Sequence, residues 1–160
     1  IIGIDISEKM LEIGENKIKQ KGLEKQIKLQ LADSENLPFE SGSFDGITAG
    51  FGVRNFENLQ LGLSEMRRVL KKDGIVVILE PSKPKYFPVK QIYSAYFHQI
   101  LPFFGQLISK DKRAYNYLPE SVDAFPENEK FIEILKEVGF SKVNYLPLTI
   151  GIVSLYIAIK

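Results

Sequence analysis

The hydrophobic positions in the first eighty residues change repeatedly between strand-like and helix-like spacing. Apolar residues three or four positions apart predict one helix from Ser7 to about Gly22 and another from about Asn58 to Lys72. Ser7 suits the N-cap of the first helix, and a glycine follows each helix as a stop signal. Continuous or alternating apolar runs predict strands around these helices, at residues 1–6, 27–31, 44–51 and 75–79.

The pattern changes after residue 81. Residues 86–108 hold seven aromatic side chains, which favour an apolar, aromatic pair of helices. Residues 115–126 are interpreted as a loop because they contain Pro119 and Pro126. Beyond them the pattern indicates a helix at about 127–138, then two strands joined by a turn at Gly151, at about 142–148 and 152–159.

Strands that alternate with helices and end in a hairpin predict an α/β sheet, mostly parallel with an antiparallel C-terminal edge. In such sheets ligands bind outside the carboxyl ends of the strands. This rule selects residues at or just after the ends of the predicted strands as candidates for chemistry: Asp5, Asp33, Gly50–Asn55 and Glu80.

Composition narrows the class of protein. The 160 residues suffice for one domain, and 44% apolar with 26% charged residues is typical of a globular chain. A net charge of +1 disfavours a nucleic-acid binder that relies on bulk electrostatics. The absence of cysteine excludes disulfides, thiolate zinc sites and a cysteine nucleophile, and the single histidine, His98, excludes a multi-histidine metal centre.

The sequence also favours a cytoplasmic location. It has no cysteine, and its first residues show neither an initiator methionine nor a basic leader, so we expect no signal peptide and a start within a domain. The most apolar stretch, residues 91–109, is interrupted by polar side chains and is not expected to span a membrane.

Two acidic residues suggest an adenosine site. Asp5, at the end of the first strand, is suited to bind the two hydroxyls of a ribose, although it is equally suited to cap the following helix. Asp33, at the end of the next strand, is suited to accept a hydrogen bond from an adenine amine, although an Asx turn is as good an interpretation. Because Asp5 and Asp33 lie at the ends of consecutive strands, binding of ribose by one and of adenine by the other is favoured over two unrelated local contacts.

Three further residues are candidates for catalysis. Arg54 and Asn55 follow the third strand, where they could stabilise a developing phenolate; alternatively, Arg54 pairs with a nearby acid. His98 has the ordinary pKa of a general base, but its apolar neighbours favour a lining or core histidine. The aromatic stretch is interpreted as core, as a partner surface or as a channel for a long apolar tail.

Several segments resemble one protein family. Gly3–Leu11, Ala32–Phe39 and Phe44–Asp45 are similar to class I S-adenosylmethionine-dependent methyltransferases in general. More specific segments resemble the UbiE-like methyltransferases, which C-methylate quinone precursors: Gly50–Asn55, Glu80–Pro84, Tyr115–Val122 and Phe125–Pro126. The resemblance covers essentially the whole chain.

This resemblance implies a fold and a domain organisation. The fold would be the Rossmann-like, seven-stranded class I sheet with strand order 3-2-1-4-5-7-6, and the sequence lacks its first strand and Gly-rich loop. Residues 1–160 would be a single methyltransferase domain, the C-terminal two-thirds of the family's length. An aromatic helical insertion at about 86–126 would cover the substrate. Without the central strand, we expect little or no donor binding by this chain alone.

The resemblance also implies site residues. Asp5 would bind the donor's ribose, Ile6 would lie against adenine, and Asp33 with Ser34 would meet the adenine amine. The methionine part would lie between Gly50 and Phe51. The quinol would be faced by Arg54, Asn55 and residues of the 115–126 segment, namely Tyr115, Tyr117, Ser121 and Phe125.

The expected activity is C-methylation of a polyprenylated quinol in menaquinone or ubiquinone biosynthesis, with menaquinone preferred. S-adenosylmethionine would be the donor and S-adenosylhomocysteine the product, with no metal and no nucleic acid involved. We also expect peripheral contact with the inner face of the membrane, and a homodimer or domain swap as an oligomeric option.

Three other functions remain open. The protein could methylate another small apolar acceptor, although the segments at 50–55 and 115–126 disfavour this. It could be a non-catalytic binding module, against which the joint presence of Asp5, Asp33, Arg54 and Asn55 argues. A nicotinamide dehydrogenase could use Asp5 but would need the glycine fingerprint that this sequence lacks.

Overall fold

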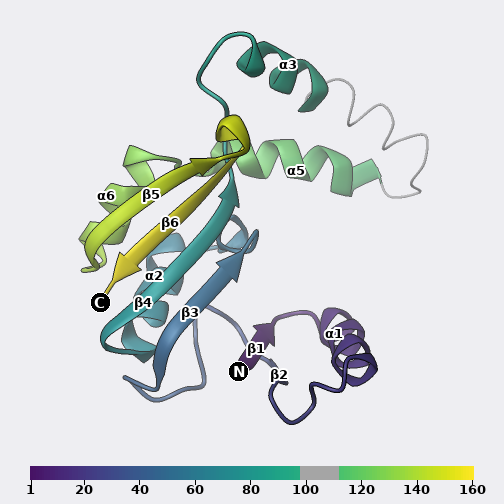
Figure 1. Ribbon diagram of the computed structural model, residues 1–160, viewed down its shortest axis with the longest axis vertical. Coiled ribbons are helices and arrows are strands. Elements are labelled where there is room, and N and C mark those ends of the chain that lie inside the picture. Colours follow the sequence, from purple (N-terminus) through teal and green to yellow (C-terminus); the bar gives the residue numbers. More distant parts are fainter. Residues whose placement is uncertain (98–111) are drawn as a thin grey trace.

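The computed structural model describes residues 1–97 and 112–160, and of residues 112–116 only the backbone (Figure 1). The candidate base His98 therefore lies outside the described residues. Two parallel strands with one helix form an N-terminal lobe, and a larger lobe contains a four-stranded sheet with the remaining helices.

The N-terminal lobe consists of β1 (Ile2–Asp5), α1 (Glu8–Gln20) and β2 (Lys28–Leu31). Ser7 caps α1 as predicted, since its hydroxyl accepts a hydrogen bond from the Met10 amide at 3.4 Å. Leu29 packs into the space that Gly3 and Gly14 leave, because a Cβ at either glycine would lie within 2.8 Å of the leucine side chain. This packing places α1 against the β1–β2 pair.

The larger lobe has strand order β3-β4-β6-β5. The parallel pair is β3 (Phe44–Gly50) with β4 (Leu70–Pro81), and β6 (Val153–Ile159) lies antiparallel between β4 and β5 (Ser141–Leu148). The helical segments are η1 (Val53–Asn55), α2 (Leu59–Val69), α3 (Val89–Ala95), α5 (Lys112–Ala124), α6 (Glu129–Glu137) and η3 (Thr149–Gly151).

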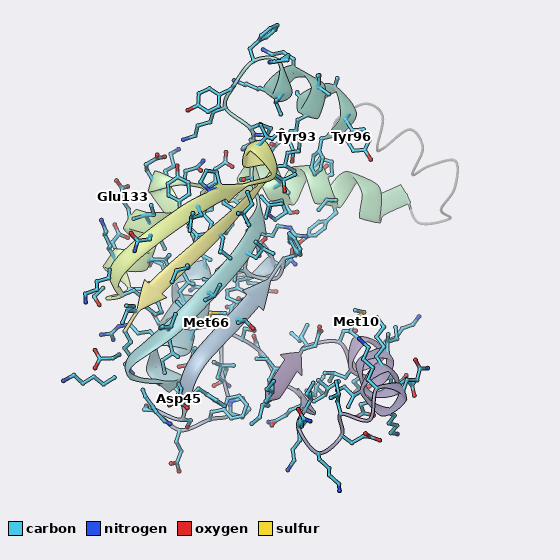
Figure 2. The ribbon with its side chains drawn as sticks, in the orientation of Figure 1. Met10, Asp45, Met66, Tyr93, Tyr96 and Glu133 are labelled. Carbon is cyan, nitrogen blue, oxygen red and sulfur yellow. The ribbon has the colours of Figure 1, made fainter. Side chains whose placement is uncertain are left out.

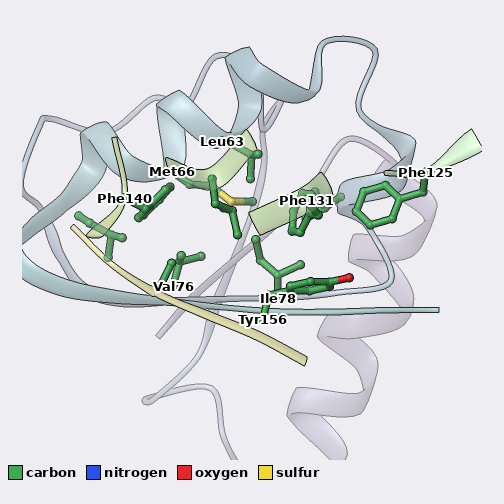
Figure 3. Close-up of a cluster of buried hydrophobic side chains, with 12 residues drawn as sticks. Leu63, Met66, Val76, Ile78, Phe125, Phe131, Phe140 and Tyr156 are labelled. Atoms are coloured by element: carbon green, nitrogen blue, oxygen red, sulfur yellow. The ribbon is translucent and has the colours of Figure 1, made fainter. Parts of the chain in front are cut away.

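The hydrophobic core lies between the larger sheet and the helices α2 and α6 (Figure 3). Phe131 of α6 is fully buried, with its ring centroid 4.9 Å from Phe125 and 4.7 Å from Tyr156 of β6. Met66 belongs to this core, whereas Met10, in the N-terminal lobe, is 55% exposed (Figure 2). The core thus supports the larger lobe and does not reach α1.

The sheet confirms the expected α/β class and its antiparallel C-terminal hairpin. Taken together, the orders β2-β1 and β3-β4-β6-β5 follow the expected class I order. β1 and β3, which that order separates by the first strand of the fold, belong to different sheets here. Gly151 lies in the hairpin connection at φ +86°, a backbone conformation that favours glycine.

The prediction of a loop at 115–126 was wrong, because most of this segment forms α5. Pro119 lies inside the helix, which a proline normally disrupts. However, Ser121, Val122 and Phe125 recur at helical spacing and are all buried. Burial of this face therefore outweighs the local cost of the proline.

The second helix also ends earlier than predicted. It stops at Val69, and β4 begins at Leu70 and continues through a turn with Asp73 at φ 62°. Gly74 is required in this turn, since a Cβ there would lie 2.9 Å from the Lys71 carbonyl oxygen. Among the helices that the structure describes, none is long and apolar enough to cross a membrane.

Candidate active site

The loop after β3 is held in place by the end of β4. Phe51, at φ 59°, donates its amide hydrogen to the Leu79 carbonyl at 2.8 Å. The Glu80 carboxylate oxygen Oε1 then accepts the amide of Val53 at 2.7 Å and that of Arg54 at 3.4 Å. These contacts fix η1 at the carboxyl end of the parallel strands, where α/β folds place their ligands.

Arg54 is held from several sides. Its Nη1 lies 3.1 Å from Glu80 Oε2 and also donates to the Phe51 carbonyl. Its Nε donates to the Ser121 hydroxyl at 3.3 Å. The side chain is 11% exposed and that of Glu80 fully buried, so the ion-pair interpretation of Arg54 is confirmed.

Burial raises the pKa of Glu80 above its ordinary value of 4.5. Arg54 and the two backbone amides oppose this rise, because each stabilises the carboxylate form.

The helix α5 supplies the other side of the site. The Tyr117 hydroxyl donates to Asn55 Oδ1 at 2.8 Å, and Ser121 donates to the Leu118 carbonyl at 3.0 Å while it accepts from Arg54. Beside these contacts lies an open groove of about 450 Å³. Apolar side chains, Phe125 among them, make up most of its lining, which also includes five polar residues: Arg54, Glu57, Tyr117, Glu120 and Ser121.

The structure thus brings together five of the residues predicted to face the donor or the acceptor: Phe51, Arg54, Asn55, Tyr117 and Ser121. Phe125 joins them as part of the groove. Of Tyr115 only the backbone, within α5, is described.

The residues predicted to bind adenosine lie in the N-terminal lobe. Asp33 Oδ1 accepts the Glu35 amide at 2.8 Å, so the Asx-turn interpretation of Asp33 is confirmed. Asp5 Oδ1 accepts the Ser7 amide at 2.8 Å in a similar turn, but the N-cap of α1 is Ser7, so the capping interpretation of Asp5 was wrong. The two strand ends are adjacent, since the Ala32 amide donates to the Asp5 carbonyl at 3.1 Å. Neither Asp5 Oδ2 nor Asp33 Oδ2 makes a hydrogen bond within the described part of the chain.

These residues fit a bound adenosine. Both Oδ2 atoms can accept hydrogen bonds from ribose hydroxyls or an adenine amine. Ile6 is 75% exposed and offers an apolar surface, and Ser34 lies next to Asp33. At Gly50 an added Cβ would meet no atom within 4 Å, so a ligand has room beside the end of β3. Within the described residues, no hydrogen bond joins the residues predicted to bind adenosine to Arg54 or to α5.

Two site-supporting residues escaped the sequence analysis. Arg68 of α2 donates to the carbonyls of Leu37 and Phe39 at 2.9 and 2.7 Å, and Glu65 accepts the Leu37 amide at 2.9 Å. They hold the segment that contains Asp33 against the larger lobe. Their spacing of three residues on a helix was the available signal, but it is common on solvated helix faces.

The described residues include no group of three or more histidine, cysteine, aspartate or glutamate side chains that could hold a metal ion.

Comparison with known proteins gives a consistent picture. A family model described as the ubiE/COQ5 methyltransferase family matches residues 1–160. A demethylmenaquinone methyltransferase of Bacteroides fragilis is 47% identical over 160 residues, which are all of this chain and 65% of that protein. The ubiquinone/menaquinone biosynthesis C-methyltransferase UbiE of Geotalea uraniireducens is 42% identical over 160 residues, all of this chain and 68% of that protein. The chain thus spans about two thirds of the length of these relatives.

Solved structures support the fold. A SAM-dependent methyltransferase from Aquifex aeolicus matches with a TM-score of 0.67 and 17% identity, over 99% of this chain and 67% of that one. The CurJ carbon methyltransferase matches with a TM-score of 0.66 and 21% identity, over 99% of this chain and 40% of that one. At these identities the likeness shows the class I methyltransferase fold alone.

Proposed function

The chain belongs to the ubiE/COQ5 methyltransferase family, and from this premise we propose that the protein C-methylates a polyprenylated quinol with S-adenosylmethionine as donor. A naphthoquinol of menaquinone biosynthesis is the preferred acceptor, because the B. fragilis relative is named for demethylmenaquinone.

One observation of the site carries the proposal: the cation of Arg54 is held by Glu80 and Ser121 beside a mainly apolar groove. An aromatic carbon becomes nucleophilic when the neighbouring hydroxyl loses its proton, which leaves negative charge on the oxygen. A preorganised guanidinium stabilises such an oxyanion, because it needs no reorganisation at the moment of reaction. Asn55, whose Oδ1 accepts from Tyr117, adds an amide donor next to it.

For the donor we propose the assignments that the resemblance implies. Asp5 binds the ribose hydroxyls, Ile6 contacts adenine, and Asp33 with Ser34 receives the adenine amine. Gly50 and Phe51 flank the methionine part. When bound, S-adenosylmethionine supplies an electrophilic methyl group, and the protein contributes by holding that group in line with the ring carbon.

The direct test is a methyl-transfer assay with the full-length protein and S-adenosylmethionine carrying a labelled methyl group. We expect label on a ring carbon of a demethylated, polyprenylated naphthoquinol and less on the matching benzoquinol. Transfer only to small phenols would favour another apolar acceptor. Binding of S-adenosylhomocysteine without any transfer, or no binding at all, would contradict the proposal.

We also propose that the segment at 81–97 contacts the cytoplasmic surface of the membrane, where such an acceptor resides. Tyr86 and Phe87 are 77% and 81% exposed, and Ile92 of α3 is 65% exposed. The segment has three lysines and no acidic residue, although Lys83 pairs with Asp123 and Glu127, and Lys85 with Glu129. Tyr96, directly after α3, is 49% exposed. Exposed aromatics beside lysines suit an anionic lipid surface.

Co-sedimentation with vesicles that contain anionic lipid tests this contact. The double variant Tyr86→Ala/Phe87→Ala should lose most of the bound fraction. Leu61→Ala is the matched control, because Leu61 is 45% exposed but lies in α2, outside residues 81–97. Equal binding of the double variant and the unchanged protein would argue against membrane contact through this segment.

A further inference from the structure

Glu80 is the one acidic side chain that is buried among the residues the structure describes. A buried carboxylate is costly unless its oxygens are satisfied. Here the two oxygens have different partners, since Oε1 accepts the amides of Val53 and Arg54, and Oε2 pairs with the Arg54 guanidinium at 3.1 Å. The same side chain therefore holds both the backbone and the charged end of one residue.

The contacts of Arg54 leave one edge of its guanidinium for a ligand. Nη1 is occupied by Glu80 and the Phe51 carbonyl, and Nε by Ser121. Nη2 makes no hydrogen bond to the described residues. Because Arg54 also lines the groove, Nη2 is the donor that remains for an oxygen bound there.

We propose that Glu80 is a positioning residue for the methyl transfer: its buried carboxylate holds Arg54 so that Nη2 faces the acceptor oxygen in the groove. This inference rests on the proposed function. Glu80 itself does not touch the acceptor. Its effect on the reaction passes entirely through the orientation of the Arg54 guanidinium.

A purely structural role for Glu80 makes a different prediction, and Glu80→Gln separates the two. If the glutamine Oε1 keeps the amide of Val53, its NH₂ group comes to face the guanidinium. Two donors cannot hydrogen-bond to each other, so Arg54 loses its anchor while η1 keeps its own. If Glu80 only stabilised the fold, the kcat of Glu80→Gln would fall only in proportion to the fraction of the variant that is unfolded.

The experiment measures kcat, the quinol KM, S-adenosylhomocysteine affinity and the melting temperature of the full-length protein. Loss of one preorganised oxyanion donor lowers kcat about 10²–10³-fold, so misplacing one should lower it by about tenfold or more. For Glu80→Gln we expect this fall in kcat, with donor affinity within about twofold of that of the unchanged protein. In an Arg54→Ala background, Glu80→Gln should lower kcat no further.

Glu127→Gln is the matched control. Glu127 likewise accepts a backbone amide, that of Lys83 at 2.8 Å, and pairs with the Lys83 ammonium at 3.7 Å, but it does not line the groove. Its kcat should stay within about twofold of the unchanged protein. If Glu80→Gln does not fold, Ser121→Ala serves as the second variant, since it removes the Nε partner of Arg54 and should lower kcat severalfold.

Three outcomes would overturn the inference: unchanged kcat in Glu80→Gln, an equal further loss in the Arg54→Ala background, or unchanged kcat in Ser121→Ala where Glu80→Gln is unfolded. Failure of the proposed function is seen separately, as absence of methyl transfer by the unchanged protein. In that case, calorimetric titration of the same variants with 1,4-naphthohydroquinone still measures whether Glu80 acts through Arg54.

Discussion

Arg54 illustrates how single residues combine burial with charge at this site. A free arginine side chain has many rotamers, but here its guanidinium is held by an ion pair and by a hydrogen bond that it donates to Ser121 of a neighbouring helix. The conformational entropy lost in this arrangement is lost on folding, before any ligand binds. A cation that is already ordered is the kind of group that stabilises a transition state effectively.

Replacing Arg54 by alanine should therefore affect turnover more than donor binding. We expect kcat to fall about 10²–10³-fold, with S-adenosylhomocysteine affinity within about twofold of that of the unchanged protein. Steady-state kinetics and calorimetry measure the two effects. Arg67→Ala is the control, because Arg67 donates to the Gly139 carbonyl and does not line the groove. If Arg54→Ala turned over as fast as the unchanged protein, Arg54 would not be the group that stabilises the acceptor oxyanion.

Glu80 should also affect how stability depends on pH. Its folded-state pKa lies above 4.5 because burial disfavours the charged form. The folded state then binds more protons than the unfolded state, so this contribution is fully present below about pH 4.5 and is lost as the pH rises through the raised pKa.

Urea denaturation at several pH values tests this dependence. The free energy of unfolding of the unchanged protein should fall relative to that of Glu80→Gln as the pH rises from about 4.5. Parallel pH profiles for the two proteins would contradict the raised pKa. Asp45→Asn is the comparison variant, because Lys71 lowers the pKa of the exposed Asp45 and the pH dependence should have the opposite sign.

Among the elements, α5 and α2 each carry contacts that no local pattern reveals. Tyr117 and Ser121 of α5 reach Asn55 and Arg54, some sixty residues earlier in the chain. Arg68 of α2 reaches back to Leu37. The two helices thus determine where the loop after β3 and the segment with Asp33 lie.

Replacing Arg68 by alanine should loosen the segment at 33–39. The carbonyls of Leu37 and Phe39 would lose their donor, and Glu65 would lose its ion partner. We expect a lower urea midpoint and a severalfold weaker affinity of the full-length protein for S-adenosylhomocysteine. Lys71→Ala, which removes the exposed ion pair with Asp45, should change the urea midpoint and this affinity much less. Equal effects of the two variants would rule out a specific role for Arg68.

At the scale of the whole molecule, the two lobes differ in packing. α1 has no buried residue, whereas the core of the larger lobe joins β4, β6, α2 and α6 through side chains that are fully buried. Stability should therefore reside mainly in the larger lobe.

Phe131→Ala and Met10→Ala test this difference. Phe131 is fully buried between Phe125 and Tyr156, so its truncation should lower the free energy of unfolding by about 3–5 kcal/mol. Met10 is 55% exposed, and its truncation should cost about 0.5 kcal/mol or less. Urea denaturation followed by circular dichroism measures both. A similar loss in the two variants would show that the lobes share one core.

Local patterns in the sequence were sufficient for the existence of the strands, for the N-cap Ser7 and for the sheet class, because these depend on residues close together in the chain. They were not sufficient for the end of the second helix, since Gly74, predicted to follow that helix, lies inside β4. Ser7 caps α1, and Gly151 lies in the terminal hairpin connection, as local chemistry requires. Local chemistry failed at 115–126, where two prolines indicated a loop and burial of one face produced a helix.

The sequence by itself also determined which chemical groups are available: an arginine and an amide after β3, acids after β1 and β2, and no cysteine. The tertiary structure alone decided their partners. The pairing of Arg54 with Glu80 and Ser121, and that of Asn55 with Tyr117, depend on segments 26 to 67 residues apart. Such contacts arise from the packing of whole elements, and spacing along a chain carries no information about which distant element will supply the partner.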